Sequence, residues 1–125
     1  MCKKILIVDD DENTSMIIGR EIMKYFNVDY DTAYDVFEAL RMINTFQYSM
    51  IITDISLPVK SGHEIVRICI ERNLPIMVVT AYNPNLIFID KRVNACLTKP
   101  IDFDQLHQSI KGILKVQDLK ELEYV

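Results

Sequence analysis

Residues 5–12 of this 125-residue chain read Ile-Leu-Ile-Val-Asp-Asp-Asp-Glu, a short apolar run that ends abruptly in four acids. A continuous apolar run of this length is typical of a strand buried on both faces, as in a parallel sheet covered by helices. The residues that follow, 14–26, carry large apolar side chains four positions apart, which is one stripe of a helix. Asp11 or Asn13 is placed to cap that helix. The stretch therefore predicts a buried strand that leads directly into a helix, with acids at the junction.

The same alternation of apolar runs and helically patterned segments repeats along the chain. Further strands are predicted at residues 28–34, 50–53, 75–79 and 94–98, with helices beginning near residues 36, 63, 84 and 103. The helix after Pro84 has the weakest pattern, and the strand at 28–34 alternates as a more exposed strand does. Strands that alternate with helices form right-handed βαβ units. We therefore predict an α/β fold, a five-stranded parallel sheet that is doubly wound, with helices on both faces.

Composition limits the classes of function. Hydrophobic residues make up 50% of the chain and charged residues 26%, which is ordinary for a globular domain. The net charge of -4 argues against a nucleic-acid-binding surface. No apolar stretch is long enough for a membrane span or a signal peptide. The cysteines, Cys2, Cys69 and Cys96, are odd in number and widely spaced, which favours reduced thiols in a cytoplasmic protein. We expect one domain over residues 1–118, with 119–125 as a tail or the start of a linker.

Polar residues stand at four of the five predicted strand ends. They are Asp9–Asp11 after the first strand, Asp54 after the third, Thr80 at the end of the fourth and Lys99 after the fifth. Singly, each has an ordinary explanation as a helix cap, a turn residue, a β-branched strand residue or a solvated lysine. Together they converge at the carboxyl edge of one sheet, where ligands of doubly wound folds bind.

Converging carboxylates need compensation. Two of them about 4 Å apart repel by about 4 kcal/mol at an effective dielectric constant near 20, so a proton, a lysine or a metal must hold three together. An all-oxygen cluster with an open shell suits Mg²⁺, or Mn²⁺ in its place. Asp54 beside a cation and a lysine fits a carboxylate nucleophile that forms an aspartyl phosphate. Thr80 and Lys99 are placed to bind the phosphoryl oxygens.

Four segments in order match one family. They are Ile5-Leu6-Ile7-Val8-Asp9-Asp10, the run from Asp54 through Pro58 to Gly62, Val78-Val79-Thr80-Ala81 and Leu97-Thr98-Lys99-Pro100. Over essentially its whole length the chain resembles the receiver domain of two-component response regulators. The resemblance implies a flavodoxin-like sheet with strand order 2-1-3-4-5.

By that resemblance each site residue has a role. The roles are Asp54 as phosphoacceptor, Asp10, Asp54 and the backbone carbonyl of Ser56 as Mg²⁺ ligands, Asp9 acting on Mg²⁺ through a water, and Thr80 and Lys99 as contacts of the phosphoryl group. A cis peptide is also implied between Lys99 and Pro100.

The resemblance implies a cytoplasmic signalling switch rather than an enzyme acting on other substrates. The phosphodonor would be a histidine kinase or a histidine phosphotransfer domain, and slow self-dephosphorylation would reset the switch. An output domain or partner protein would read its state, with a homodimer as a further option and no direct contact with nucleic acid or membrane.

Several residues depart from the family pattern. Cys96 stands where receivers commonly carry Tyr or Phe, so the usual coupling of Thr80 to an aromatic is not expected. Arg92-Val93 replaces a common Gly-Ala, which predicts a different loop. Tyr82, two residues beyond Thr80, is predicted to limit access of water to the site.

Three further features remain outside that pattern. Residues 86–89 are four consecutive large apolar residues, and a helix would spread them over about 300°. Either the segment is partly non-helical or buried, or it forms a partner or dimer surface. His63 and His107 lack ligand partners and are predicted to lie on the surface.

Two rival functions remain. A phosphatase similar to the haloacid dehalogenase family would need D-x-D-x-T, but Asn13 stands where the Thr belongs, and no acidic motif ends a strand after Lys99. A degenerate receiver would act only as an interaction module and would lack some of the site residues. All five expected site residues are present here: Asp9, Asp10, Asp54, Thr80 and Lys99.

Overall fold

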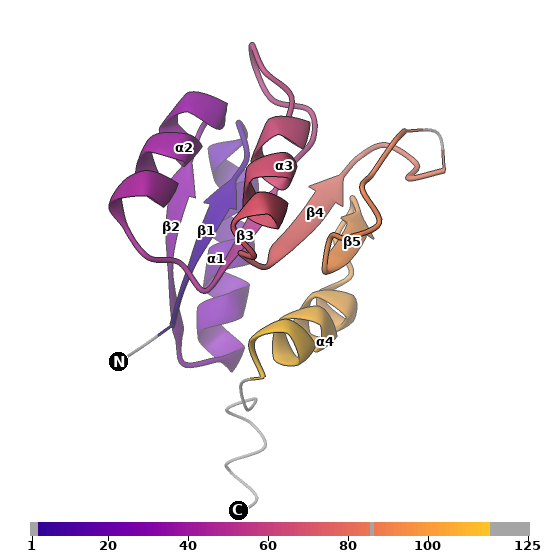
Figure 1. The fold of residues 1–125 in the computed structure, drawn as a ribbon. Coiled ribbons are helices and arrows are strands. Elements are labelled where there is room, and N and C mark those ends of the chain that lie inside the picture. The colour runs from indigo at the N-terminus through magenta and orange to yellow at the C-terminus, as the bar shows by residue number, and fades with distance from the viewer. Residues whose placement is uncertain (1–2, 86, 116–125) are drawn as a thin grey trace, which may run out of the picture.

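The computed structural model describes residues 3–85 and 87–115, which form one five-stranded sheet and four helices. The strands are β1 (Lys3–Val8), β2 (Val28–Ala33), β3 (Met50–Thr53), β4 (Ile76–Thr80) and β5 (Ala95–Thr98). The helices are α1 (Glu12–Tyr25), α2 (Val36–Thr45), α3 (His63–Glu71) and α4 (Phe103–Leu114). All strand pairs are parallel and their order is β2-β1-β3-β4-β5, which confirms the predicted sheet. Helices α1 and α4 cover one face, and α2 and α3 cover the other (Figure 1).

The central strands are buried on both faces because their side chains alternate between two cores. In β1, Ile5 and Ile7 face the core under α1 and α4, whereas Leu6 and Val8 face the core under α2 and α3. Strand β2, at one edge of the sheet, buries only its end residues, Val28 and Ala33, as its weaker pattern predicts. The two-sided burial fixes the register of β1 and β3, and with it the position of the residues that follow them.

Aspartates begin three of the helices. The Asp11 carboxylate accepts a hydrogen bond from the backbone N–H of Asn13 at the start of α1, which confirms Asp11 as the cap. Asp35 and Asp102 cap α2 and α4 in the same way. The acids at residues 9–12 therefore differ in role, because the Asp11 carboxylate caps α1.

The segment between β4 and β5 contradicts the helix predicted after Pro84. None of its described residues, 81–85 and 87–94, is helical. Side chains bond to the local backbone instead: Asn83 accepts from the N–H of Asn85, and Asp90 accepts from the N–H of Arg92. The Arg92 guanidinium also donates to both oxygens of Asp90, and these hydrogen bonds lower the pKa of that carboxyl. Such local bonds offer the backbone an alternative to a helix.

The apolar residues of this segment are divided by the irregular backbone. Ile89 and Val93 pack against the core under α2 and α3, so the segment covers part of the face that a helix would cover. Phe88 points away and is 79% exposed. Leu86 lies outside the described residues. The non-helical interpretation of residues 86–89 is therefore confirmed for the part that the structure describes.

The two histidines differ. His63 is exposed, as predicted, but the surface prediction for His107 is wrong. Its ring lies between α1 and α4, with its centroid 4.2 Å from that of Tyr25 and its Nε2 3.2 Å from a carboxylate oxygen of Glu21. His107 lies next to the apolar residues of α4, and helix α1 packs against this side of α4 and covers the ring.

The described cysteines are free thiols, as predicted. Cys69 is buried in α3 and Cys96 is partly buried in β5, and burial raises the pKa of both thiols. Cys2 and the proposed tail, residues 119–125, lie outside the described residues. Within the described part of the chain, no helix is both long and apolar enough to cross a membrane.

Candidate functional site

Backbone hydrogen bonds extend the sheet one residue past three strands and so fix the site residues. The N–H of Asp54 donates to the Val8 carbonyl at 2.9 Å, and the N–H of Lys99 donates to the Thr80 carbonyl at 2.8 Å. The N–H of Asp9 similarly donates to the Ala33 carbonyl of β2 at 3.1 Å. These residues are therefore held at the carboxyl edge of the sheet by the same ladder that forms the fold.

Lys99 joins the two buried carboxylates. Its Nζ lies 2.8 Å from Asp9 Oδ2 and 2.9 Å from Asp54 Oδ2, although the three residues come from distant parts of the chain. Asp9 is 5% exposed and Asp54 is 7% exposed. Burial by itself lowers the pKa of Lys99, but the hydrogen bonds to Asp9 and Asp54 outweigh it, so the pKa of the ammonium is raised. The ammonium thus keeps two buried negative charges together.

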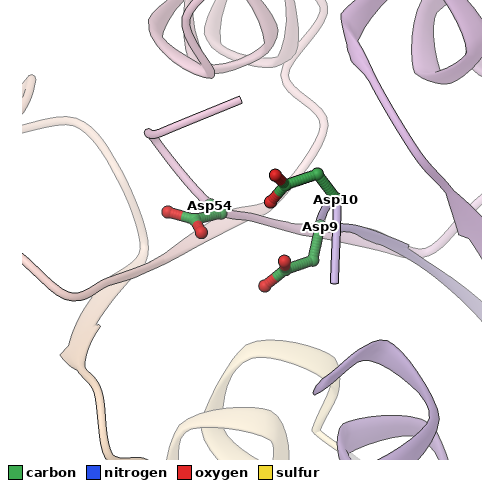
Figure 2. Close-up of side chains that lie close together, drawn as sticks. All are labelled: Asp9, Asp10 and Asp54. Carbon is green, nitrogen blue, oxygen red and sulfur yellow. The ribbon is translucent and has the colours of Figure 1, made fainter. Parts of the chain in front are cut away.

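Asp10 completes a group of three carboxylates. One oxygen each of Asp9, Asp10 and Asp54 lies within 4.8 Å of the others, and the three side chains gather at one place (Figure 2). The N–H of Asp11 donates to Asp9 Oδ1 at 2.8 Å, and the N–H of Ser56 donates to Asp54 Oδ1 at 3.1 Å. Asp10 is exposed, so the group is open on one side.

The donor set fits a hard divalent cation. Every potential ligand atom is a carboxylate oxygen, and an open side leaves room for the waters that Mg²⁺ retains. Within the described residues no other three Asp, Glu, His or Cys side chains converge in this way. Nitrogen or sulfur ligands, which would favour zinc, do not contribute to the group.

Thr80 lies at the same edge but is engaged elsewhere. It is fully buried at the end of β4, next to β3, and its Oγ1 accepts a hydrogen bond from the N–H of Tyr82 at 3.1 Å. The side chain of Tyr82 is about half exposed. The structure therefore brings Asp9, Asp10, Asp54 and Lys99 into one cluster and leaves Thr80 as a neighbour with a local partner.

Two features of the site escape sequence reasoning. A Cβ on Gly62 would overlap the backbone carbonyl oxygen of Asp54, so the loop after β3 can close only on a glycine. The Ser15 hydroxyl is buried without a hydrogen-bond partner, and it lines a cavity shared with Asp9 and Asp10. The need for Gly62 depends on the distance between two backbone segments, and the burial of the Ser15 hydroxyl depends on side-chain packing. Neither property can be read from the residue type alone.

The cis peptide between Lys99 and Pro100 is present, as the resemblance implied. Cys96, in β5, packs against the core under α2 and α3, so a partly buried thiol occupies the position of the usual aromatic.

Comparison with known proteins agrees with this geometry. The family model for the response regulator receiver domain matches residues 5–111, and the chain belongs to this family. The general function of this family is phosphorylation-based signalling in two-component systems. Membership of this family argues against the alternative of a phosphatase similar to the haloacid dehalogenase family.

Relatives and solved structures give the extent of the likeness. The response regulator ArlR of Staphylococcus aureus is 31% identical over 123 residues, covering 95% of this chain and 56% of ArlR. The chain thus spans about half the length of the curated relatives it matches. The regulator TrrA of Thermotoga maritima, solved in complex with Mg²⁺-BeF, is 28% identical with a TM-score of 0.81, covering 90% of this chain and 99% of TrrA. The chemotaxis regulator CheY4 of Vibrio cholerae shares the fold, with a TM-score of 0.80 at 24% identity over 91% of this chain and all of CheY4 (100%).

Proposed function

We propose that this domain accepts a phosphoryl group on Asp54 from a histidine kinase or a histidine phosphotransfer domain, in a reaction that depends on Mg²⁺ or Mn²⁺. The observation that carries the proposal is the cluster of three carboxylate oxygens within 4.8 Å, two of whose residues also bond Lys99. A structural role alone would not require three carboxylates to meet at an open edge of the sheet.

Each residue of the site has its own role in the proposed reaction. Asp9, Asp10, Asp54 and the backbone carbonyl of Ser56 would hold the cation, which when bound neutralises carboxylate charge and polarises the phosphoryl oxygens. An oxygen of Asp54 attacks phosphorus, the bond between phosphorus and the donor imidazole breaks, and that imidazole nitrogen keeps the electron pair and takes up a proton. Lys99, already 2.9 Å from Asp54, then pairs with a phosphoryl oxygen.

Thr80 would report the change. Its hydroxyl accepts from the Tyr82 N–H in this state, and a bond to the phosphoryl group would require the hydroxyl to donate to a phosphoryl oxygen. We propose that the Thr80 hydroxyl moves toward the phosphoryl group, and that this movement shifts the domain from an inactive to an active state. Cys96 cannot follow it as an aromatic ring would, so we propose that the signal leaves through the backbone of the β4–β5 segment.

Incubation with acetyl phosphate and Mg²⁺, followed by intact mass spectrometry, tests the proposal. We expect wild-type protein to gain one phosphoryl group, Asp54→Asn to gain none, and chelation of Mg²⁺ to abolish the reaction. An unmodified wild type would favour the alternative, a degenerate receiver that acts as a phosphorylation-independent interaction module.

The proposed partners follow from the same function. The domain would act in the cytoplasm as a switch without activity on other substrates, and its net charge of -4 disfavours direct contact with nucleic acid. An output domain or a partner protein would read its state, and the exposed Phe88 is available for such a partner or for a homodimer.

Tyr82→Ala is expected to shorten the lifetime of the phosphorylated state. Tyr82 follows Thr80 by two residues and its backbone N–H bonds the Thr80 hydroxyl, and we propose that its half-exposed ring limits approach of the hydrolytic water. If the ring raises the barrier by ~1 kcal/mol, its removal makes hydrolysis about fivefold faster. The measurement is loss of the phosphorylated mass with time after the donor is removed. Phe46→Ala, at a half-exposed aromatic ring that ends α2 away from the site, is the control, and equal lifetimes in all three proteins would disprove shielding.

A further inference from the structure

Val59 adopts a backbone conformation that its side chain disfavours. Its φ is 68°, and the N–H of Lys60 donates to the carbonyl of Pro58 at 2.8 Å. A hydrogen bond across three residues with a positive φ at the centre defines a γ-turn of the rare, strained kind. Asn73 and Lys115 are the other described non-glycine residues with positive φ, and neither is β-branched. For a β-branched residue this conformation is an outlier.

The fold gains no packing from this side chain. Val59 is 89% exposed and belongs to neither core. Glycine or asparagine would adopt the same turn with less strain. The strained backbone is destabilising and the exposed side chain contributes no packing in return, so the explanation of the strain lies outside the folding of this domain.

The turn stands on the loop that carries the phosphoacceptor. The base of this loop is closed by two bonds to the Ile55 carbonyl, from the N–H of Gly62 and the hydroxyl of Ser61. The loop between β3 and α3 projects beyond the carboxyl edge of the sheet (Figure 1). Asp54 itself is only 7% exposed, so a protein that delivers a phosphoryl group to it must cover this edge and meet the loop tip.

A second contact connects the loop to α2. The Nζ of Lys60 lies 5.5 Å from the centroid of the Phe37 ring, which is also exposed. This cation–π pair holds the residue next to Val59 against the start of α2. The valine therefore stands in a turn closed by its own hydrogen bond, beside a residue that has a contact outside the loop.

We propose that Val59 is a docking contact for the phosphodonor protein, which presents an apolar side chain beside its phosphohistidine. The inference rests on the proposed function, because the donor is placed here by the position of Asp54. The strained turn keeps the valine at the point that an approaching donor meets first.

Two substitutions separate the side chain from the turn. Val59→Gly removes the side chain and relieves the strain, whereas Val59→Thr retains the β-branched shape and the turn but replaces a methyl with a hydroxyl. The protein donor is the phosphorylated histidine kinase, of those encoded in the same genome, that phosphorylates the wild type fastest. Acetyl phosphate with Mg²⁺ is the small donor, which needs no docking surface. Asn73→Gly, at a left-handed position in the turn after α3, is the control for backbone flexibility.

We expect Val59→Gly to unfold at a higher temperature than the wild type and to react normally with acetyl phosphate. Transfer from the kinase at low concentration should be about tenfold slower in both Val59 variants, as loss of one apolar contact predicts, and unchanged in Asn73→Gly.

Four results would overturn the proposal. Three concern the variants: a wild-type rate of transfer from the kinase in both Val59 variants, equal slowing with both donors, and a change confined to self-association measured by sedimentation. The fourth is failure of every kinase to phosphorylate a wild type that reacts with acetyl phosphate. A wild type that reacts with neither donor would instead contradict the proposed function itself.

Discussion

Lys99→Met is expected to lower the free energy of unfolding by about 3 kcal/mol in metal-free buffer, the low end for removing one partner of a buried ion pair. The reason is that Asp9 and Asp54, both nearly buried, would lose the ammonium that bonds them at 2.8 and 2.9 Å. The low end applies because Lys99 itself keeps some contact with solvent. Chemical denaturation of both proteins in the presence of a chelator measures the difference.

Mg²⁺ should restore part of the lost stability. A cation that binds the folded protein only stabilises it by mass action, and in the variant it replaces the missing positive charge between the carboxylates. We therefore expect Mg²⁺ to raise the unfolding temperature of Lys99→Met by more than that of the wild type. Lys91→Met, at an exposed lysine in the β4–β5 segment, should behave as the wild type throughout. If Mg²⁺ raised the unfolding temperature of the wild type and of Lys99→Met equally, Lys99 would not be the group that balances the negative charge of the carboxylate cluster.

The effect of Lys99 should also depend on pH in a defined direction. Because the folded pKa of Lys99 is raised above its ordinary value of 10.5, the ion pairs stabilise the fold fully below that value. Their contribution is lost as the pH rises through the raised folded pKa, where the ammonium deprotonates. The stability difference between the wild type and Lys99→Met should therefore be constant near neutral pH and narrow above about pH 10.5.

Much of this site could be predicted because it depends on strand ends. Once the apolar runs define parallel strands, the residues after them must share one edge, whatever their distance in sequence. That reasoning brings Lys99 to Asp54 across a sequence separation of 45 residues. The bond from Lys99 to Asp9, rather than to the exposed Asp10, could not be predicted, since it depends on side-chain burial that the pattern does not contain.

The errors have physical causes of a different kind. The helix expected after Pro84 is absent because Asn83 and Asp90 bond their own local backbone, a competition that apolar periodicity does not register. His107 is covered because α1 packs over it, and contacts between helices distant in sequence are decided by the tertiary fold. The strained turn at Val59 is likewise invisible, since valine is a residue that sequence rules would not place there.

Gly62→Ala is expected to disable the site through its backbone. The φ of Gly62 is -59°, which any residue adopts, so space rather than conformational freedom requires the glycine. A Cβ would overlap the Asp54 carbonyl oxygen and lie 2.9 Å from both the Asp54 carbonyl carbon and the Ile55 Cα. Because these are backbone atoms, the loop itself must shift, and overpacking of this kind destabilises by about 3 kcal/mol.

The shift in Gly62→Ala would move Asp54 away from Lys99 and from the Ser56 N–H, which now hold its two oxygens. Displacement of a reacting group by about 1 Å slows a reaction about a hundredfold, and we expect that loss in phosphorylation by acetyl phosphate. Gly112→Ala is the matched control, since no atom lies within 4 Å of its Cβ position on the exposed side of α4. It should gain ~0.5–1 kcal/mol of stability from the better helix former and react at the wild-type rate. If Gly62→Ala were as stable and as reactive as the wild type, the close approach of this loop to Asp54 would not position the Asp54 carboxylate.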